Sequence, residues 1–242
     1  MYRICVLCNL VINNYGVIKY MKIFKTNFKK SLSLICIFFI ITLFISILAS
    51  CVESTKQKFL ESSQFLSKNS LSVLVKSKKR LVGKEFFFII EKEKHIILHK
   101  NLSLISNNNS FEGIAIFFNE SPKIIPHLIQ GRFIEKDDFN KNEPVIVIGK
   151  DLLDKVKIIN NNKYLTYNSS NYRVIGVMGY ENKKSSYDKK FFINLKYMLT
   201  NIEFIEFFQD LSWKVDSVTG SPKQIINSIN KFTICFYVVV SS

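Results

Sequence analysis

The three histidines, His95, His99 and His127, are the side chains best suited to metal or acid–base chemistry. His95 and His99 are four positions apart, a spacing that on a helix places two zinc ligands on one face, and Glu91 lies nearby. The stretch 94–99 is instead rich in apolar and β-branched residues and predicts a strand, where residues four apart lie far from each other along one face. We therefore expect surface or hairpin histidines and no metal site.

Carboxylates and nucleophiles offer no catalytic pattern. Charged strand faces and turns account for the acidic pairs Glu91/Glu93 and Asp137/Asp138. The sequence has no Ser/His/Asp order typical of a triad and no phosphate-binding loop of the GxxxxGK[ST] type. We therefore expect a chain that is not an enzyme, binds no cofactor and hydrolyses no nucleotide itself.

All five cysteines lie outside the stretch between Glu53 and Ile234, which therefore has no internal disulfide. They are Cys5, Cys8, Cys36, Cys51 and Cys235. Cys5 and Cys8 form a CxxC, but no second pair of cysteines or histidines completes a zinc site around it.

The element that positions the rest of the chain is a membrane segment, Ser31 to Val52, with 22 residues and no charge. At about 1.5 Å per residue such a helix is about 33 Å long, enough to cross a hydrocarbon core of about 30 Å. Four lysines lie between Met21 and Lys30, and Glu53 follows the run. Because basic residues stay in the cytoplasm, we expect a single-pass protein of the cell membrane, with the N-terminus inside and the main domain outside.

Two features of this region leave alternatives open. Met21 begins a stretch typical of a natural start, so residues 1–20 of the basic cytoplasmic leader 1–30 could be a non-native extension. The tetrapeptide Leu48-Ala49-Ser50-Cys51 resembles the bacterial lipobox, in which the cysteine is lipidated after cleavage. The apolar run exceeds the about 7–15 residues usual for a signal peptide, which favours a retained helix. A lipoprotein with its lipid on Cys51, acting as an extracytoplasmic binding module, stays the alternative.

The chain is strongly basic, with a net charge of +15. Such a balance fits nucleic acid, anionic lipid or mere solubility, and a Lys- and Asn-rich usage typical of a low-GC genome inflates it. The predicted topology disfavours nucleic acid. The run Lys76–Arg80 predicts a solvated loop, which would contact anionic lipid headgroups if it lies near the membrane.

Residues 53–232 predict a strand-rich α+β domain outside the membrane, and the 48% hydrophobic residues of the chain are enough to build its core. A helix or polar stalk is expected over 53–70. Aromatic and β-branched runs predict strands at 71–75, 85–91, 94–99, 113–118, 144–149, 163–167, 172–178 and 191–195. Helical turns are expected over 151–156, and Ser221-Pro222 is typical of a helix start.

Several pieces of this domain follow one another in a recognisable order. They are Leu128-Ile-Gln-Gly131-Arg132-Phe133, the acidic Asp137-Asp138, the strand Pro144–Gly149, and Asn171-Tyr-Arg-Val-Ile-Gly176-Val-Met178. Ser185–Asp188 and Trp213–Asp216 also fit the pattern. The order resembles the extracytoplasmic core domain of MacB-like ABC-transporter permeases, which are related to FtsX-like and lipoprotein-releasing permeases. The resemblance runs from about Met21 to Phe232.

The resemblance makes Gly131, Arg132, Phe133, Gly149 and Gly176 structural motif residues. From the residues themselves, we expect Gly131 in a turn with positive φ. We expect Arg132 to bind a carboxylate across the domain, since its guanidinium is a fixed bidentate donor.

The resemblance also implies a function. Such permeases pair with a cytoplasmic ABC ATPase and a second permease chain, and pass ATP-driven motion through the bilayer to the outer domain for export or for handling lipids, lipoproteins or peptides. The family has three more membrane helices after this domain. Here the tail 233–242 has too few apolar residues to cross a membrane, which predicts a truncated or split permease. The substrate and the direction of transport are not specified by these residues.

Overall fold

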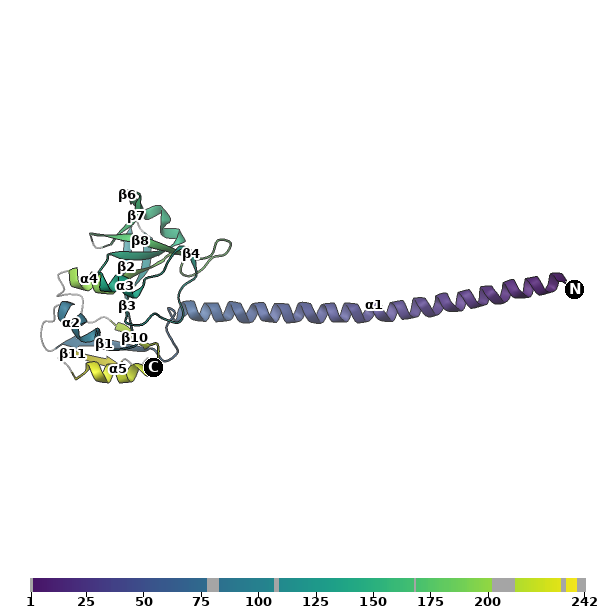
Figure 1. The fold of residues 1–242 in the computed structure, drawn as a ribbon, viewed down its shortest axis with the longest axis horizontal. Helices are drawn as coiled ribbons and strands as arrows, with labels where there is room; N and C mark the ends of the chain where they lie inside the picture. Colours follow the sequence, from purple (N-terminus) through teal and green to yellow (C-terminus); the bar gives the residue numbers. More distant parts are fainter. Residues whose placement is uncertain are drawn as a thin grey trace. The chain divides into compact units, whose positions relative to one another are not determined.

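The structure is a computed structural model that describes residues 2–77, 83–106, 109–167, 169–201, 212–231 and 234–238. The chain divides into two compact units, Met1–Lys58 and Phe59–Ser242. The first unit is helical, and its helix α1 (Tyr2–Ser62) continues into the first residues of the second (Figure 1).

The apolar part of α1 has the length and composition of a membrane span. The segment Ser31–Ser62 contains an 18-residue window with a mean hydropathy of 2.9, and none of this window is buried. The hydroxyl of Thr42 donates to the carbonyl of Phe39 at 2.9 Å, and that of Ser46 to Thr42 at 2.8 Å. Because their hydroxyls are satisfied within the helix, the few polar residues of the run do not oppose insertion into a bilayer.

The second unit is built from short helices and one mixed sheet. Its elements are β1 (Leu71–Ser77), α2 (Gly83–Ile90), β2 (Ile96–Ser106), β3 (Asn109–Phe118), β4 (Leu128–Gly131), α3 (Lys136–Asn140), β5 (Val145–Gly149), the 3-10 turn η1 (Lys150–Lys155), β6 (Lys157–Ile159), β7 (Asn162–Tyr167), β8 (Ser170–Met178), β9 (Lys190–Asn194), α4 (Leu195–Asn201), β10 (Ser212–Ser217), α5 (Pro222–Ile229) and β11 (Ile234–Val238).

Ten strands follow the order β11-β1-β10-β2-β3-β9-β5-β8-β7-β6 in the described part of the chain, and β4 pairs separately with β8. The pairs β3–β9 and β5–β8 are parallel, whereas the other pairs are antiparallel. Figure 1 shows the sheet running from β6 and β7 at one end of the domain to β11 and α5 at the other. The predicted α+β class, a strand-rich domain after one apolar helix, is confirmed.

Aromatic side chains form much of the core. Phe87 contacts Phe117 at a ring-centroid distance of 5.1 Å, and Phe117 contacts Phe139 at 5.2 Å. The single tryptophan, Trp213, is fully buried on β10 and packs against Phe86 at 5.5 Å. These edge and tilted contacts join α2, α3 and the sheet into one core.

The strand predicted over 85–91 is wrong, because this stretch forms the helix α2. Phe86, Phe87 and Ile90 are buried, while Phe88 is 65% exposed. Positions 86, 87 and 90 share one side of a helix, whereas a strand would place Phe86 and Phe88 on the same face. Aromatic composition had favoured a strand, but the spacing of the buried residues is helical.

Strands extend into two stretches that were expected to be a tail and a loop. Residues 234–238 of the predicted tail form β11, which pairs antiparallel with β1. Of the predicted loop Lys76–Arg80, residues 76–77 belong to the strand β1, and residues 78–80 lie outside the described residues.

Candidate functional site

Two motif glycines allow β4 and β8 to meet at very short range. Gly131 pairs with Gly176 across the two strands and has a φ of +78°. A Cβ at Gly131 would lie 2.2 Å from the carbonyl oxygen of Ile175, and one at Gly176 would lie 2.3 Å from that of Arg132. Backbone atoms cannot withdraw as a flexible side chain can, so both positions require glycine.

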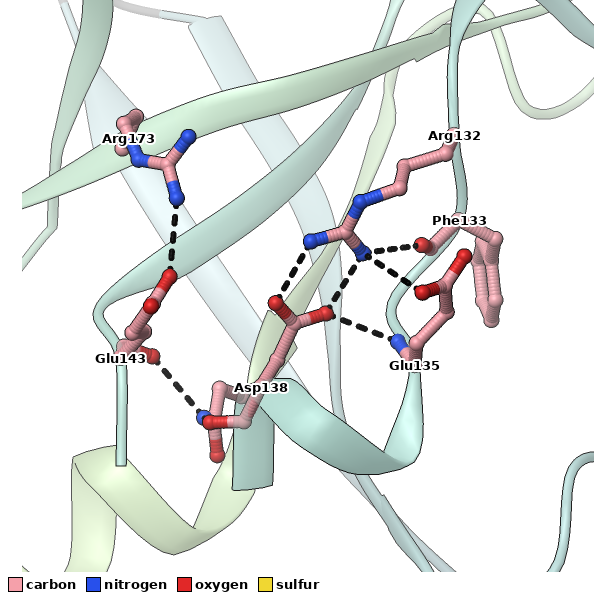
Figure 2. A network of polar contacts seen from close by, with 7 residues as sticks. Arg132, Phe133, Glu135, Asp138, Glu143 and Arg173 are labelled. Carbon is pink, nitrogen blue, oxygen red and sulfur yellow. Dashed lines mark hydrogen bonds and ion pairs between the residues drawn. The ribbon is translucent and has the colours of Figure 1, made fainter. Parts of the chain in front are cut away.

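This close approach positions Arg132, whose guanidinium faces the carboxylate of Asp138 (Figure 2). Nη1 and Nη2 each donate to one carboxylate oxygen at 2.7 Å, and Nη1 also donates to the carbonyl of Phe133 at 3.0 Å. The backbone N–H of Glu135 donates to Asp138 at 2.8 Å. The side chain of Asp138 is only 3% exposed and that of Arg132 is 41% exposed. The pair joins the end of β4 to α3 through six residues of chain, rather than reaching across the domain.

The pKa of Asp138 reflects competing effects. Burial alone would raise it, but the hydrogen bonds from Arg132 and Glu135 and the positive charges of Arg132 and Arg173 together lower it. The carboxylate is therefore ionised in the folded domain, and its role here is structural.

A second pair extends the network toward α4. Arg173 donates to Glu143 at 2.8 Å (Figure 2). The side-chain amide of Asn194 donates to the carbonyls of Asp138 at 3.0 Å and Glu143 at 2.9 Å. Asn194 is fully buried at the end of β9. The network thus fixes α3 against the central strands.

The remaining motif residues make close packing contacts. Phe133 is 6% exposed and contacts Phe192 at a centroid distance of 5.2 Å. A Cβ at Gly149 would lie 2.2 Å from the carbonyl oxygen of Tyr187 and 2.3 Å from that of Asp188. Gly149 therefore lets the loop before β9 lie directly against the end of β5.

A joint at the end of α1 forms a second polar network, which the sequence reasoning missed. Glu61 accepts hydrogen bonds from Ser185 Oγ at 3.0 Å, from Ser186 N at 3.1 Å and from Ser186 Oγ at 2.8 Å. The hydroxyl of Tyr187 donates to the backbone carbonyl of Glu61 at 3.1 Å. The ring of Tyr187 stacks on Phe192 at 5.9 Å, so this last helical turn is tied directly to the core. Burial and the nearby negative charges of Glu61 and Glu112 raise the pKa of the Tyr187 hydroxyl, which therefore stays protonated and able to donate.

The chain after α1 is tied a second time. Gln64 and Phe65 adopt positive φ angles of 57° and 61°, which turn the chain sharply at the helix end. Ser67 then donates from its backbone N–H and from its hydroxyl to the two oxygens of Asp216, each at 2.6 Å. Asp216 is 2% exposed at the end of β10. We call Glu61, Ser67 and their partners the joint. The residues that Glu61 and Ser67 contact lie in Ser185–Asp188 and Trp213–Asp216. The sequence analysis placed these two pieces in the motif order but predicted no function for them.

The histidines do not converge. His95 is exposed in the turn before β2, where it pairs with Glu120. His99 is 3% exposed on β2, which pairs with β3 as an antiparallel hairpin, so of the expected surface or hairpin positions it takes the hairpin one. Burial, and then the positive charge of Lys214, lower its pKa to about 3. Among the described residues, no group of three or more His, Cys, Asp or Glu side chains could hold a metal ion. Cys51 is exposed within α1.

These features define a class of protein, in which a folded α+β domain follows an apolar helix of membrane length and carries buried polar networks around Asp138 and Glu61. The sequence model of one family, the MacB-like periplasmic core domain, matches residues 32–219. The chain belongs to this family, and the predicted resemblance is confirmed. The apolar helix and the family together indicate a membrane-anchored protein with an extracytoplasmic domain.

Solved structures with similar folds have low sequence identity. The periplasmic region of MacB from Actinobacillus actinomycetemcomitans is 16% identical, with a TM-score of 0.44 over 75% of this chain and 94% of that one. The extracellular domain of the noncanonic ABC-type transporter YknZ from Gram-positive bacteria is 10% identical, with a TM-score of 0.42 over 71% and 100%. A domain of a putative permease from Porphyromonas gingivalis is 13% identical, with a TM-score of 0.35 over 72% and 91%. No curated protein sequence matches this chain.

Proposed function

We propose that the chain is a non-catalytic permease subunit of an ABC transporter. Its N-terminus lies in the cytoplasm, α1 crosses the membrane, and the domain that begins at Phe59 works outside it. A cytoplasmic ABC ATPase and a second permease chain complete the assembly, which exports substrates or handles lipids, lipoproteins or peptides. Family membership and the four lysines before the apolar run support this proposal.

The joint is the observation that carries the proposal. A domain that only needed tethering would function on a flexible linker. Here the last turn of α1 makes four hydrogen bonds to Ser185, Ser186 and Tyr187, and Ser67 adds two more to Asp216. A joint of this kind lets movement of the helix end reach the sheet without loss in a slack segment.

Purification of the full-length chain from its native membrane in mild detergent tests the assembly. We expect an ABC ATPase and a second permease chain to co-purify and the complex to hydrolyse ATP. A chain that purifies alone, with no associated ATPase activity, would overturn the proposal. Orientation has its own test, in which a membrane-impermeant amine reagent on intact cells should label Lys163 and leave Lys25 unmodified; the opposite pattern contradicts the topology.

The role of the joint is tested on the same complex by hydrogen exchange with and without ATP. We expect ATP to change exchange at residues 59–67 and at 185–187. Glu61→Ala should keep the complex but remove the change at 185–187, because the three bonds to its carboxylate are lost. The control Glu53→Ala, at an exposed position of α1, should respond like the wild type. An unchanged response in Glu61→Ala would remove the joint from the mechanism.

A further inference from the structure

Two loops of the domain lie beside the joint. The loop 180–189 holds Ser185 and Ser186 on Glu61, and Lys150 fixes it by donating to the carbonyls of Tyr180 at 2.6 Å and Lys183 at 2.9 Å. The loop 121–127 contributes Pro122, Ile124 and Pro126 to a small cavity that Gln64, Phe65 and Leu66 also line. A hollow of about 480 Å³ lies between the two loops and is lined by residues 127–129 and 180–183. A second hollow, of about 560 Å³, lies away from these loops, beyond the end of α2. We call 121–127 and 180–189 the junction loops.

The junction loops expose basic and apolar side chains together. Ile124 and Ile125 are 43% and 45% exposed, although neighbouring residues of the domain bury their apolar groups. Lys123, Lys183, Lys184 and Lys189 are exposed in the same two loops, where Glu181 is the exposed acid. Within the described part of the chain, Lys184 and Lys189 form no ion pair, because the neighbouring Asp188 is buried and pairs with Lys150 at 3.3 Å.

An aromatic cluster completes this surface. The ring of Tyr180 stacks on His127 at a centroid distance of 4.5 Å, and the ammonium of Lys183 lies 3.9 Å from the same ring. Amphipathic rings, exposed isoleucines and lysines are the combination that is enriched where proteins meet lipid headgroups.

Chain length keeps this surface near the bilayer. Six residues, and so seven Cα–Cα steps, separate Val52, the last of the uncharged run, from Phe59, the first of the domain. Even fully extended, they span at most about 25 Å, and as a helix about 10 Å. Because Glu61 is hydrogen-bonded to the loop 180–189, this chain length also limits how far the loop can lie from the membrane surface.

We propose that the junction loops bind the anionic phospholipid surface from which α1 emerges, with Lys184 and Lys189 on lipid phosphates and Ile124 and Ile125 at the headgroup boundary. This proposal rests on α1 spanning a membrane but not on an ATPase partner or on which side the domain lies. This contact holds the domain against the bilayer next to the joint. It assigns a function to the junction loops, which contain exposed residues outside the family motif.

Hydrogen exchange of the full-length chain in lipid nanodiscs tests the proposal. Discs of neutral phosphatidylcholine are compared with discs that contain about a third phosphatidylglycerol, at low salt and at about 0.5 M salt. We expect slower exchange in both junction loops in the anionic discs, and loss of this protection at high salt. Lys184→Glu/Lys189→Glu should weaken the contact by at least about 30-fold, the equivalent of about 2 kcal/mol at about 1 kcal/mol per lysine.

The matched control is Lys84→Glu/Lys94→Glu, which reverses one exposed lysine in α2 and one shortly after its end. It carries the same net charge as the test variant and should keep the wild-type protection. Equal exchange in neutral and anionic discs, or equal protection in the test and control variants, would overturn lipid binding. Protection that depends on a co-purified protein and persists in neutral discs would assign the surface to a protein partner and overturn it equally. ATPase co-purification is measured separately, so failure of the lipid contact is distinguishable from failure of the permease proposal.

Discussion

Removal of Arg132 should reverse the contribution of Asp138 to the response of the domain to acid. The side chain it leaves behind, Asp138, is 3% exposed and would keep only the hydrogen bond from Glu135 N. Loss of one partner of a buried ion pair costs about 3–5 kcal/mol, and we expect Arg132→Met to lie at the lower end because the arginine is partly solvated. Asp138→Asn should cost only about 1 kcal/mol, because the remaining guanidinium is 41% exposed and still donates to the carbonyl of Phe133.

The pH dependence gives the sharper test. In the wild type the pKa of Asp138 is lowered, so its contribution to stability is present above the ordinary carboxyl pKa of about 4 and is lost as pH falls through the folded value. Without Arg132, burial prevails and raises the pKa of Asp138 above its ordinary value. Protonation then relieves the buried charge, so the deficit of Arg132→Met should shrink as pH falls from about 7 toward about 4.

Urea unfolding of the full-length chain in detergent provides the assay, with the fluorescence of Trp213 as reporter. This single tryptophan is fully buried in the same domain. Arg173→Met is the matched control, since its pair with Glu143 is 41% and 32% exposed and should contribute less than about 1 kcal/mol. A deficit of Arg132→Met that stays constant over this pH range, or an equal cost for Asp138→Asn, would refute the reasoning.

Three further predictions concern other positions. The folded pKa of His99, about 3, lies below its unfolded value of about 6.5, so the domain loses stability as pH decreases between these values, by about 3 kcal/mol at about pH 4.5. In thermal unfolding, His99→Leu should remove this pH dependence and His127→Gln should retain it. An equal pH dependence in the two variants would contradict the burial of His99. Gly176→Ala should destabilise the domain by about 2 kcal/mol or more, since its Cβ meets backbone at 2.3 Å, while Gly220→Ala, with no contact below 3.8 Å and only a positive φ, should cost about 1 kcal/mol in urea unfolding. A retained helix predicts no palmitate incorporation in the wild type; labelling that disappears in Cys51→Ala would select the lipoprotein alternative.

Local sequence signals predicted the elements in which local propensity and tertiary environment favour the same structure. The strand β5 is buried along its whole length, so its run Val145–Gly149 reads as continuously apolar. The helix α5 begins with Pro222 after Ser221, as the start signal indicated, although the Ser221 side chain makes no capping hydrogen bond. In both cases the local sequence and the tertiary environment favour the same structure.

Elements whose state depends on distant partners were not predicted. The stretch Gly83–Ile90 has the composition of a strand, and only its buried side, packed on Trp213 and Phe117, identifies it as helical. The strand β11 has a plain apolar sequence that gains its meaning from pairing with β1, more than 150 residues earlier in the chain. Intrinsic propensity is a weak guide where tertiary packing decides.

The same distinction separates the site residues that the sequence predicted from those that it did not. Gly131, Arg132 and Gly176 stood out because special residue types in a fixed order mark a backbone constraint and a bidentate donor. The joint could not be predicted in this way, since Glu61 and Ser67 are ordinary residues of a polar stretch and their partners lie 124 and 149 residues away. Yet Ser185–Asp188 and Trp213–Asp216 already belonged to the motif order without any catalytic explanation. The hydrogen bonds that these polar motif residues make give them a geometric explanation, because they attach the helix end to the sheet.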